Sequence, residues 1–309
     1  MSRAGSLLAA TVLLACGAGA RAGQMGREGS TFTALAGDSR SASLGSPAGG
    51  LIEGEAGMFA NPAAIALEPA LAFGFTQLVW PDAFYGETLA AQLPAGHGAA
   101  LGLAAFAFLH DVVPLTSELL PEGTGADANL LHAAASVSGA QYLVESLAVG
   151  ATLRVTHAQL GDDLREGLAA DLGAVWVVAP DLRVGAAVRN LGMQVEPRRT
   201  RDPLPLSLDA SVRYELADLA VPVRAYAGGR LPAYGPPSGG LAVEGGEIFG
   251  ASLRCALEIR EYGGLTWAFG LGAHRDLWRL DYALSPAGAL GLAHRFGVTL
   301  RFGSANRDL

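Results

Sequence analysis

The amino-acid sequence predicts an all-β protein whose strands close into a transmembrane barrel. Of its 309 residues, 50% are hydrophobic and only 16% are charged, whereas about a quarter of the residues in a typical soluble domain are charged. Beyond the N-terminus the longest apolar run, 98–109, is interrupted by glycine and falls short of the ~20 residues that a membrane-spanning helix needs. Diffuse hydrophobicity without such a helix is typical of a barrel, because only alternate residues of its strands face lipid.

Alternation of apolar and polar side chains supports this prediction in strand after strand. In 294–302, "HRFGVTLRF", every second residue is apolar, which gives a strand two unlike faces. The apolar face holds Phe296, Val298, Leu300 and Phe302, and the other face holds Arg295, Gly297, Thr299 and Arg301. A soluble β-sandwich turns its apolar face to a core, whereas a membrane barrel turns it to lipid and its polar face to a lumen. The apolar set persists through so many strands that we favour the barrel.

Segments separated by turns that contain glycine, proline or aspartate are predicted to be strands. Their spans are 70–79, 86–94, 98–109, 129–140, 143–157, 166–178, 182–191, 204–215, 219–228, 238–245, 248–259, 264–274, 277–285 and 290–303. This makes about 14 antiparallel strands, and an even number suits a single-chain bacterial barrel. Aromatic residues near strand ends are predicted to form girdles at the two membrane interfaces. They are Trp80, Tyr142, Trp176, Tyr214, Tyr226, Trp267 and Trp278.

Charged side chains gather on the polar faces, and we expect them to point into the lumen. The predicted lumen-facing residues are Arg154, Arg183, Arg189, Arg213, Arg254, Arg301 and Asp209, with Asp281 and Glu258 as further acids. Such a set normally fills a narrow lumen with ion pairs, and it could instead select anions. Because acids occur on the same faces as the arginines, we favour ion pairing.

The N-terminus is predicted to be a Sec-type signal peptide over 1–22, which would send the chain to the bacterial outer membrane. An arginine precedes the apolar stretch 7–15, and "ARA" offers small residues before a cut at Gly23. "LLAC" also resembles a lipobox, in which Cys16 would be lipidated. Cys255 falls among apolar residues of a strand and is predicted to act as a small hydrophobe.

Residues 23–69 lack the pattern of strands, so the barrel is predicted over 70–309. The preceding segment is rich in small residues and is predicted to contain one short helix near its end. Asn61 can cap this helix, and Pro62 suits its first position, where a missing N–H costs nothing. The segment can hang in the periplasm, or it can fold into the lumen as a plug.

The sequence does not indicate a catalytic, metal or nucleic-acid site. Its six histidines are scattered, and none lies in a nucleophile motif such as Gly-x-Ser-x-Gly. No cysteine pair and no His-x-x-x-His spacing offers a metal site. The net charge is −8, and no basic cluster of the kind that binds nucleic acid occurs. We expect no enzyme, no cofactor and no nucleic-acid partner.

Several motifs, in their order along the chain, resemble the PorV/PorQ family of the FadL-like outer-membrane barrels. "SRSASLGSPAGGL" and "GMFANPAAIA" are similar to the family's N-terminal signature, with Ala64 where glycine is usual and Ile65 where leucine is usual. "VRNLG", "DPLPLSLDASVRYEL" and the terminal hairpin at 280–303 agree as well. The motif residues are Asn61, Pro62, Asn190, Gly192, Asp281, His294 and Phe302. We expect His294 to cap a strand or to bind a carboxylate in the lumen.

The resemblance implies a fourteen-stranded barrel with an N-terminal segment inside it. It also implies a type IX-like role in protein secretion or surface attachment, with exported cargo proteins or secretion-machinery subunits as partners besides membrane lipid. The FadL-like relationship implies an alternative, transport of hydrophobic small molecules, and a structural barrel without transport is a third reading. We place the secretion role first, because five separate motifs agree with PorV/PorQ.

Overall fold

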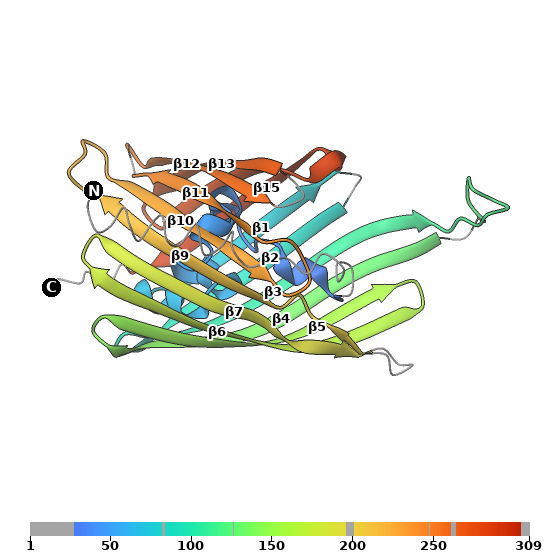
Figure 1. Ribbon diagram of the computed structural model, residues 1–309, viewed down its shortest axis with the longest axis horizontal. Coiled ribbons are helices and arrows are strands. Elements are labelled where there is room, and N and C mark those ends of the chain that lie inside the picture. Colours follow the sequence, from blue (N-terminus) through green and yellow to red (C-terminus); the bar gives the residue numbers. More distant parts are fainter. Residues whose placement is uncertain are drawn as a thin grey trace.

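The chain forms an antiparallel β-barrel around its own N-terminal segment (Figure 1). The computed structural model describes residues 28–81, 84–125, 127–195, 201–246, 248–260 and 264–303. The predicted signal peptide and Cys16 lie outside these residues. The strands are β1 (Leu71–Trp80), β2 (Phe84–Gly96), β3 (Ala99–Pro114), β4 (Asp127–Val144), β5 (Leu147–Leu160), β6 (Asp163–Ala179), β7 (Leu182–Val195), β8 (Arg201–Pro203), β9 (Ser207–Leu216), β10 (Val223–Pro232), β11 (Ser238–Gly245), β12 (Ala251–Arg260), β13 (Gly264–Arg275), β14 (Trp278–Pro286) and β15 (Leu292–Phe302).

Strand pairing confirms the predicted closed barrel of 14 strands. Each strand pairs with its neighbour in the chain, β7 pairs with both β6 and β9, and β1 pairs with β15, so that the sheet has no open edge. The short strand β8 stands outside this ring, because it pairs only with the end of β7 among the described residues. Strands β3, β4 and β6 have 16, 18 and 17 residues and extend further than the sequence pattern predicts.

The two ends of the barrel differ. At one end, which we call the terminal end, β1 begins, β15 ends and tight turns such as 145–146 join the strands. At the opposite end, which we call the loop end, the connections include the longer segment between β3 and β4, which projects from the barrel (Figure 1). Outer-membrane barrels have short turns on the periplasmic side and longer loops outside.

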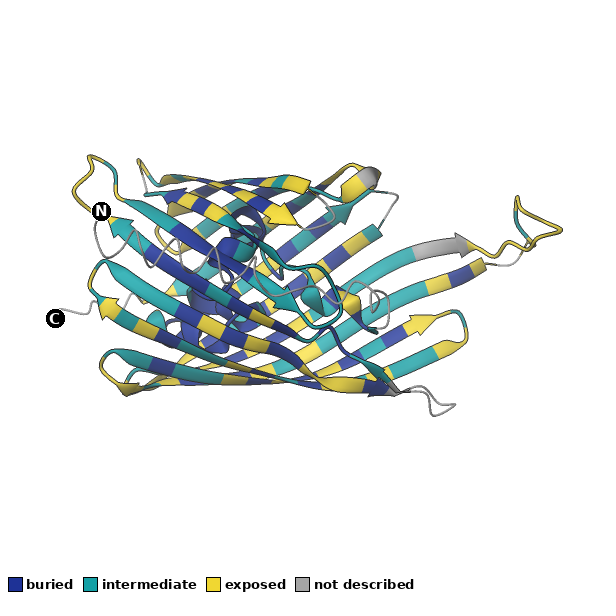
Figure 2. Cartoon of the chain, in the orientation of Figure 1, coloured by how far each residue is buried: buried dark blue, intermediate teal, exposed yellow. Residues whose placement is uncertain are grey.

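Buried and exposed residues alternate along the strands (Figure 2), as the two-faced pattern predicts. Large apolar side chains cover the outer surface, among them Phe75, Leu153, Leu257 and Phe296. No helix among the described residues has the length and apolar character needed to cross a membrane. Cys255 belongs to this outer surface and is exposed.

The predicted aromatic girdle is wrong for three of its seven members. Trp176, Tyr214, Trp267 and Trp278 occupy outward-facing positions of their strands. Trp80 instead shares the inner face of β1 with Thr76 and Leu78, and Tyr226 is only 1% exposed inside the barrel. Tyr142 likewise packs against the apolar cluster that the N-terminal segment forms. The physical reason is strand parity, by which alternate residues of a strand share one face. Each of these three residues shares its face with small or polar lumen-facing neighbours, so its side chain points inward even though it lies near a strand end.

Residues 28–70, which we call the lumen segment, fill the barrel interior (Figure 1). Their helices are η2 (Thr31–Ala34), α2 (Ser39–Leu44), η3 (Ser46–Ala48), η4 (Gly54–Phe59) and η5 (Pro62–Leu67). These helices pack against different parts of the wall: α2 contacts β11 to β15, η3 contacts β9 to β12, η4 contacts β1 to β3, and η5 contacts β3 to β6. The segment therefore contacts nearly the whole inner circumference of the barrel. Of the two locations that the sequence left open, the periplasm and the lumen, the structure shows the lumen.

The predicted helix near the end of this segment is a 3-10 helix, η5. Asn61 caps it by accepting a hydrogen bond from Ala63 N at 3.0 Å, and Pro62 occupies its first position. The amide of Asn61 also donates to the carbonyl of Gly50 at 2.7 Å and to that of Ala174 on β6 at 3.1 Å. This one side chain thus joins two turns of the lumen segment to the wall. The helix α2 was not predicted, because "SRSASL" has no apolar period.

Close backbone contact between the lumen segment and the wall leads to a first prediction. A Cβ added at Gly185 on β7 would collide with the carbonyl oxygen of Gly50, a backbone atom that cannot swing aside. We expect Gly185→Ala to lower the free energy of unfolding by about 1–3 kcal/mol, as overpacking typically does. Gly139→Ala is the matched control, because a Cβ there meets only the side chain of Leu101 at 3.7 Å. Urea unfolding in detergent measures both; equal effects would contradict the close contact.

Candidate solute-binding lumen

Ion pairs attach the lumen segment to the barrel wall. Glu53 Oε1 accepts from Arg183 Nη1 at 2.5 Å and from Arg213 Nη1 at 2.7 Å. Glu55 accepts from Arg301 at 3.0 Å, and Arg40 donates two hydrogen bonds to Glu244 at 2.8 and 2.7 Å. Every one of these contacts joins residues more than 100 positions apart, so they form only when the lumen segment lies inside the closed barrel.

The lowered pKa of Glu53 reflects its strong interaction with the arginines of the wall. Burial by itself would raise the pKa of Glu53, but the positive charges of Arg213 and Arg183 lower it to about 2 from its usual 4.5. Burial likewise opposes ionisation of Glu55, yet the charges of Arg301 and Arg279 lower its pKa below the usual range. Both carboxyl groups therefore remain ionised inside the protein at neutral pH.

The remaining charges of the predicted lumen-facing set pair within the wall. Arg154 donates to Asp171 at 2.6 Å, and Arg189 to Asp209 at 3.3 Å. Arg254 donates to Glu244 at 2.7 Å and to Asp281 at 2.5 Å. The predicted lumen-facing arginines therefore lie inside the barrel and each contacts an acid. Sequence analysis did not identify Glu53, Glu55 or Glu244 as partners. Glu53 and Glu55 belong to the lumen segment, which follows no strand period, and Glu244 was not singled out among the residues of β11.

Two of the motif residues shape β7. Asn190 has a positive φ of 58° and lies at a bulge where the pairing of β6 and β7 shifts. Its N–H donates to Asp171 at 2.6 Å, and its side-chain oxygen accepts from Arg154 at 2.7 Å. At Gly192 a side chain would collide with the backbone of Leu168 on β6. A small polar residue and a glycine are thus needed where β7 bends.

The expectation for His294 is wrong. Its ring lies on the outer surface of β15, where its Nδ1 and the hydroxyl of Tyr282 are 2.9 Å apart, so it neither caps a strand nor binds a lumen carboxylate. The reason is again parity, because Arg295 is the residue of this pair that points inward. Phe302 is also on the outside, in an edge-to-face contact with Phe73 at 6.3 Å.

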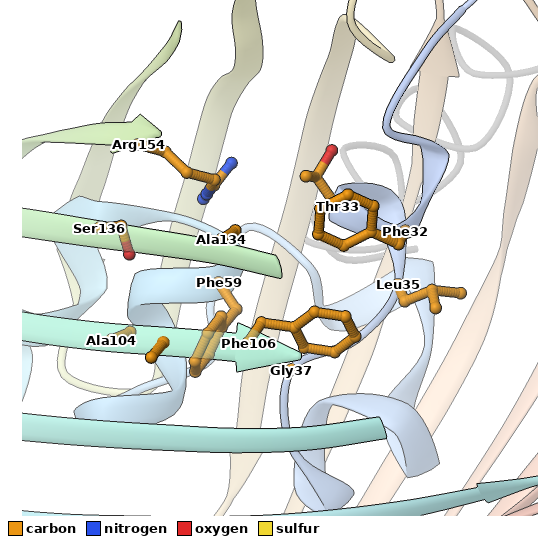
Figure 3. A pocket seen from close by; sticks show the side chains of 11 residues that line it. Phe32, Thr33, Leu35, Gly37, Phe59, Ala104, Phe106, Ala134, Ser136 and Arg154 are labelled. Atoms are coloured by element: carbon orange, nitrogen blue, oxygen red, sulfur yellow. The ribbon is translucent and has the colours of Figure 1, made fainter. Parts of the chain in front are cut away.

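Aromatic side chains line the loop-end half of the lumen. Phe32 of η2 stacks on Phe106 of β3 at 5.5 Å, and Phe84 stacks on Phe108 at 5.5 Å. Figure 3 shows Phe32, Phe59 and Phe106 around a pocket, with the guanidinium of Arg154 at its edge. The pocket has a volume of about 20 Å³, enough for about one water molecule. Sequence analysis missed this wall, although Phe84, Phe106 and Phe108 share strand parity with the lumen-facing residues.

A larger cavity adjoins this pocket. Its volume is about 350 Å³, and it shares Leu35, Gly37 and Phe59 with the small pocket. Trp80 adds an aromatic surface to the lining, and Ser285 adds a hydroxyl. A volume of this size is in the range of small-molecule sites, which are about 300–1,000 Å³. Together the two spaces form the candidate site, between the lumen segment and the loop ends of the strands.

The fold is shared with several solved structures. The Pseudomonas putida toluene transporter TodX is similar with a TM-score of 0.61 at 13% identity, covering 86% of this chain and 98% of that chain. The CymD monoaromatic hydrocarbon channel gives 0.57 at 14% identity, over 84% of this chain and 98% of that chain. A Pseudomonas aeruginosa FadL homologue gives 0.55 at 11% identity, over 86% of this chain and 98% of that chain.

In comparisons of sequence, no protein-family model and no curated protein matches the chain. None of the structural likenesses supports the PorV/PorQ resemblance in particular. At 11–14% identity they show the fold alone. The chain therefore has the fold of the FadL-like outer-membrane β-barrels.

Proposed function

We propose that this protein lies in the outer membrane and carries a hydrophobic small molecule through its lumen, by way of the candidate site. The observation that supports this most is the cavity of about 350 Å³ at the loop end, with Leu35, Phe59 and Trp80 in its lining. With the terminal end in the periplasm, as is usual for such barrels, the site faces the cell exterior. TodX and CymD, which share the fold, are described as a toluene transporter and a monoaromatic hydrocarbon channel.

The lumen segment has a defined part in this proposal. Its helix η5 lies in the terminal-end half, where Ala63, Ala64 and Ile65 are fully buried against the wall. In this proposal a solute that enters from the loop end meets this part of the segment and passes when the segment moves. The secretion role that the PorV/PorQ resemblance implied rests on sequence motifs alone and receives no support from the structural likenesses.

Uptake of radiolabelled toluene by cells tests the proposal. We expect deletion of the gene to slow uptake, and expression of the wild-type chain to restore it. Ser285→Trp should not restore it, because Ser285 lines the cavity and an indole would fill it. Leu284→Trp is the control, since Leu284 is the neighbouring residue on the other face of β14. Normal toluene uptake in the deletion strain, with exported proteins stranded in the periplasm, would instead favour the secretion role.

A further inference from the structure

The turn between β11 and β12, at the terminal end, exposes two neighbouring apolar side chains. Phe249 is fully exposed and Ile248 is half exposed. Two backbone hydrogen bonds of 2.9 Å pair Ile248 with Ala251, so Phe249 and Gly250 are the central residues of a two-residue turn. Both have a positive φ, 52° and 78° respectively, which is the mark of a type I′ turn.

Phenylalanine is an unusual residue for this position. Asparagine, aspartate or glycine normally precedes the glycine of a type I′ turn, because the Cβ of other residues is crowded at positive φ. A second turn of this kind joins β2 and β3, also at the terminal end, where His97 and Gly98 have φ of 50° and 72°. Histidine is among the residues that adopt such a φ more readily, whereas a bulky phenylalanine is an outlier. A strained and fully exposed ring indicates a functional contact.

The lengths of the strands indicate what this contact is. A membrane-spanning strand needs about 9–11 residues, and β11 has 8, fewer than any other strand of the ring. On β12 the side chain of Arg260, which is 52% exposed, marks the limit of the apolar surface at the loop end. Counted from Ile259, a span of about 9–11 residues ends between Ala251 and Phe249. The turn therefore completes the span on this side of the barrel, whereas β2 and β3, with 13 and 16 residues, are long enough without their turn.

The lipid-facing surface of β12 continues into the turn. Residues paired across a hairpin lie on the same face of the sheet, so Ile248 shares the outer face with Ala251 and with the exposed Leu253. The N–H of His274 donates to the carbonyl of Gly250 at 2.6 Å, which joins the turn to β13. The apolar tip is thus held at the edge of a surface that already contacts lipid.

We propose that Ile248 and Phe249 insert into the bilayer leaflet at the terminal end, where they contact phospholipids at the boundary between headgroups and acyl chains. This contact anchors the side of the barrel whose strands are short, and it offsets the mismatch between strand length and bilayer thickness. The turn of His97, which belongs to the long strands, stays in water. The contact does not depend on any solute in the lumen.

A fluorescent label on the full chain in phosphatidylcholine vesicles tests the location of the turn. Cys16 and Cys255 are first replaced by alanine, and nitrobenzoxadiazole is then attached at Phe249→Cys or at His97→Cys. We expect the label at 249 to emit as in lipid and to be quenched by phospholipids that carry a nitroxide near the headgroup, while the label at 97 emits as in water. Unquenched, water-like emission at 249 would overturn the proposal, and a dimer that requires Phe249 would then assign the turn to a second copy of the chain.

Phe249→Gln and His97→Gln measure the contribution of the contact. The crowding at positive φ comes from the Cβ, which phenylalanine and glutamine both carry, so Phe249→Gln leaves the strain of the turn in place. We expect Phe249→Gln to lower the folding equilibrium constant in vesicles about fivefold, because the ring no longer leaves water on folding. His97→Gln should change it by less than about twofold. Urea titration in the vesicles measures both variants, and an effect of Phe249→Gln no larger than that of His97→Gln would contradict insertion of the ring.

Discussion

Glu53→Gln is expected to destabilise the protein by about 3–5 kcal/mol, which is the usual cost of removing one partner from a buried ion pair. The loss is large because one carboxylate neutralises two arginines, Arg183 and Arg213, at 2.5 and 2.7 Å. Arg213 is only 2% exposed, so water cannot replace the lost charge. Glutamine keeps the size of the side chain, and the effect therefore reports the charge. Since Glu53 is in the lumen segment, we also expect the segment to detach and the barrel to conduct ions.

Glu68→Gln is the matched control. Glu68 also pairs with an arginine of the wall, Arg301, but its side chain is 47% exposed, and exposed ion pairs contribute only about 0–1 kcal/mol. Urea unfolding followed by tryptophan fluorescence measures the stability of both variants, and planar-bilayer recordings measure their conductance. A Glu53→Gln protein that is as stable and as closed as Glu68→Gln would refute the role of Glu53 in holding the segment.

Acid should reproduce part of the same effect. The pKa of Glu53 is about 2 in the folded protein, below its usual 4.5, so the unfolded chain takes up a proton first as the pH falls. The stability that Glu53 contributes is therefore complete above about pH 5 and declines as the pH approaches 2. In Glu53→Gln this share of the acid sensitivity should be missing. Glu55 has a lowered pKa as well, so some decline remains in the variant.

Strand periodicity was sufficient to predict the barrel, its strand number and the direction of most side chains. The reason is geometric: a period of two assigns each residue to lipid or lumen without knowledge of its neighbours in space. The same rule, applied strictly, would have placed Trp80, Tyr142 and Tyr226 inside and His294 outside. These four errors came from giving position near a strand end, or a motif match, more importance than parity.

The candidate site was harder to predict, because its parts are distant in the chain. Phe32 meets Phe106 and Glu53 meets Arg213 only once the lumen segment has entered the barrel. Residues of this segment follow no repeating pattern, so their order does not predict which residue of the barrel wall each one contacts. Arg295 shows the limit most clearly. Its inward direction follows from parity, but that its Nε has no hydrogen-bond partner among the described residues is visible only when those neighbours are in place.

Leu153→Arg should hinder insertion of the barrel into a membrane, at a cost of about 2–4 kcal/mol for a charge near the bilayer midplane. Leu153 is 59% exposed on the outer face of β5, while its neighbours Thr152 and Arg154 are buried in the lumen. Further along the same outer face lies His157, which is 4.0 Å from Glu166 of β6. Polar side chains at this level place the membrane interface there, about four residues beyond Leu153.

Gln159→Arg is the control, and comparing it with Leu153→Arg tests how deep each residue lies in the membrane. It adds the same charge to the same face of the same strand, but beyond the level of His157, where the cost should be about 0–1 kcal/mol. The fraction of heat-modifiable protein on gels after refolding into lipid vesicles measures insertion, and urea titration in the vesicles gives the energies. Equal costs at the two positions would mean that Leu153 does not face the bilayer interior. If only Leu153→Arg carries the energetic cost of insertion, the depth of β5 in the membrane is established. The pocket of Phe32, Phe59 and Phe106, which lies across the wall from His157, would then be near the outer membrane interface.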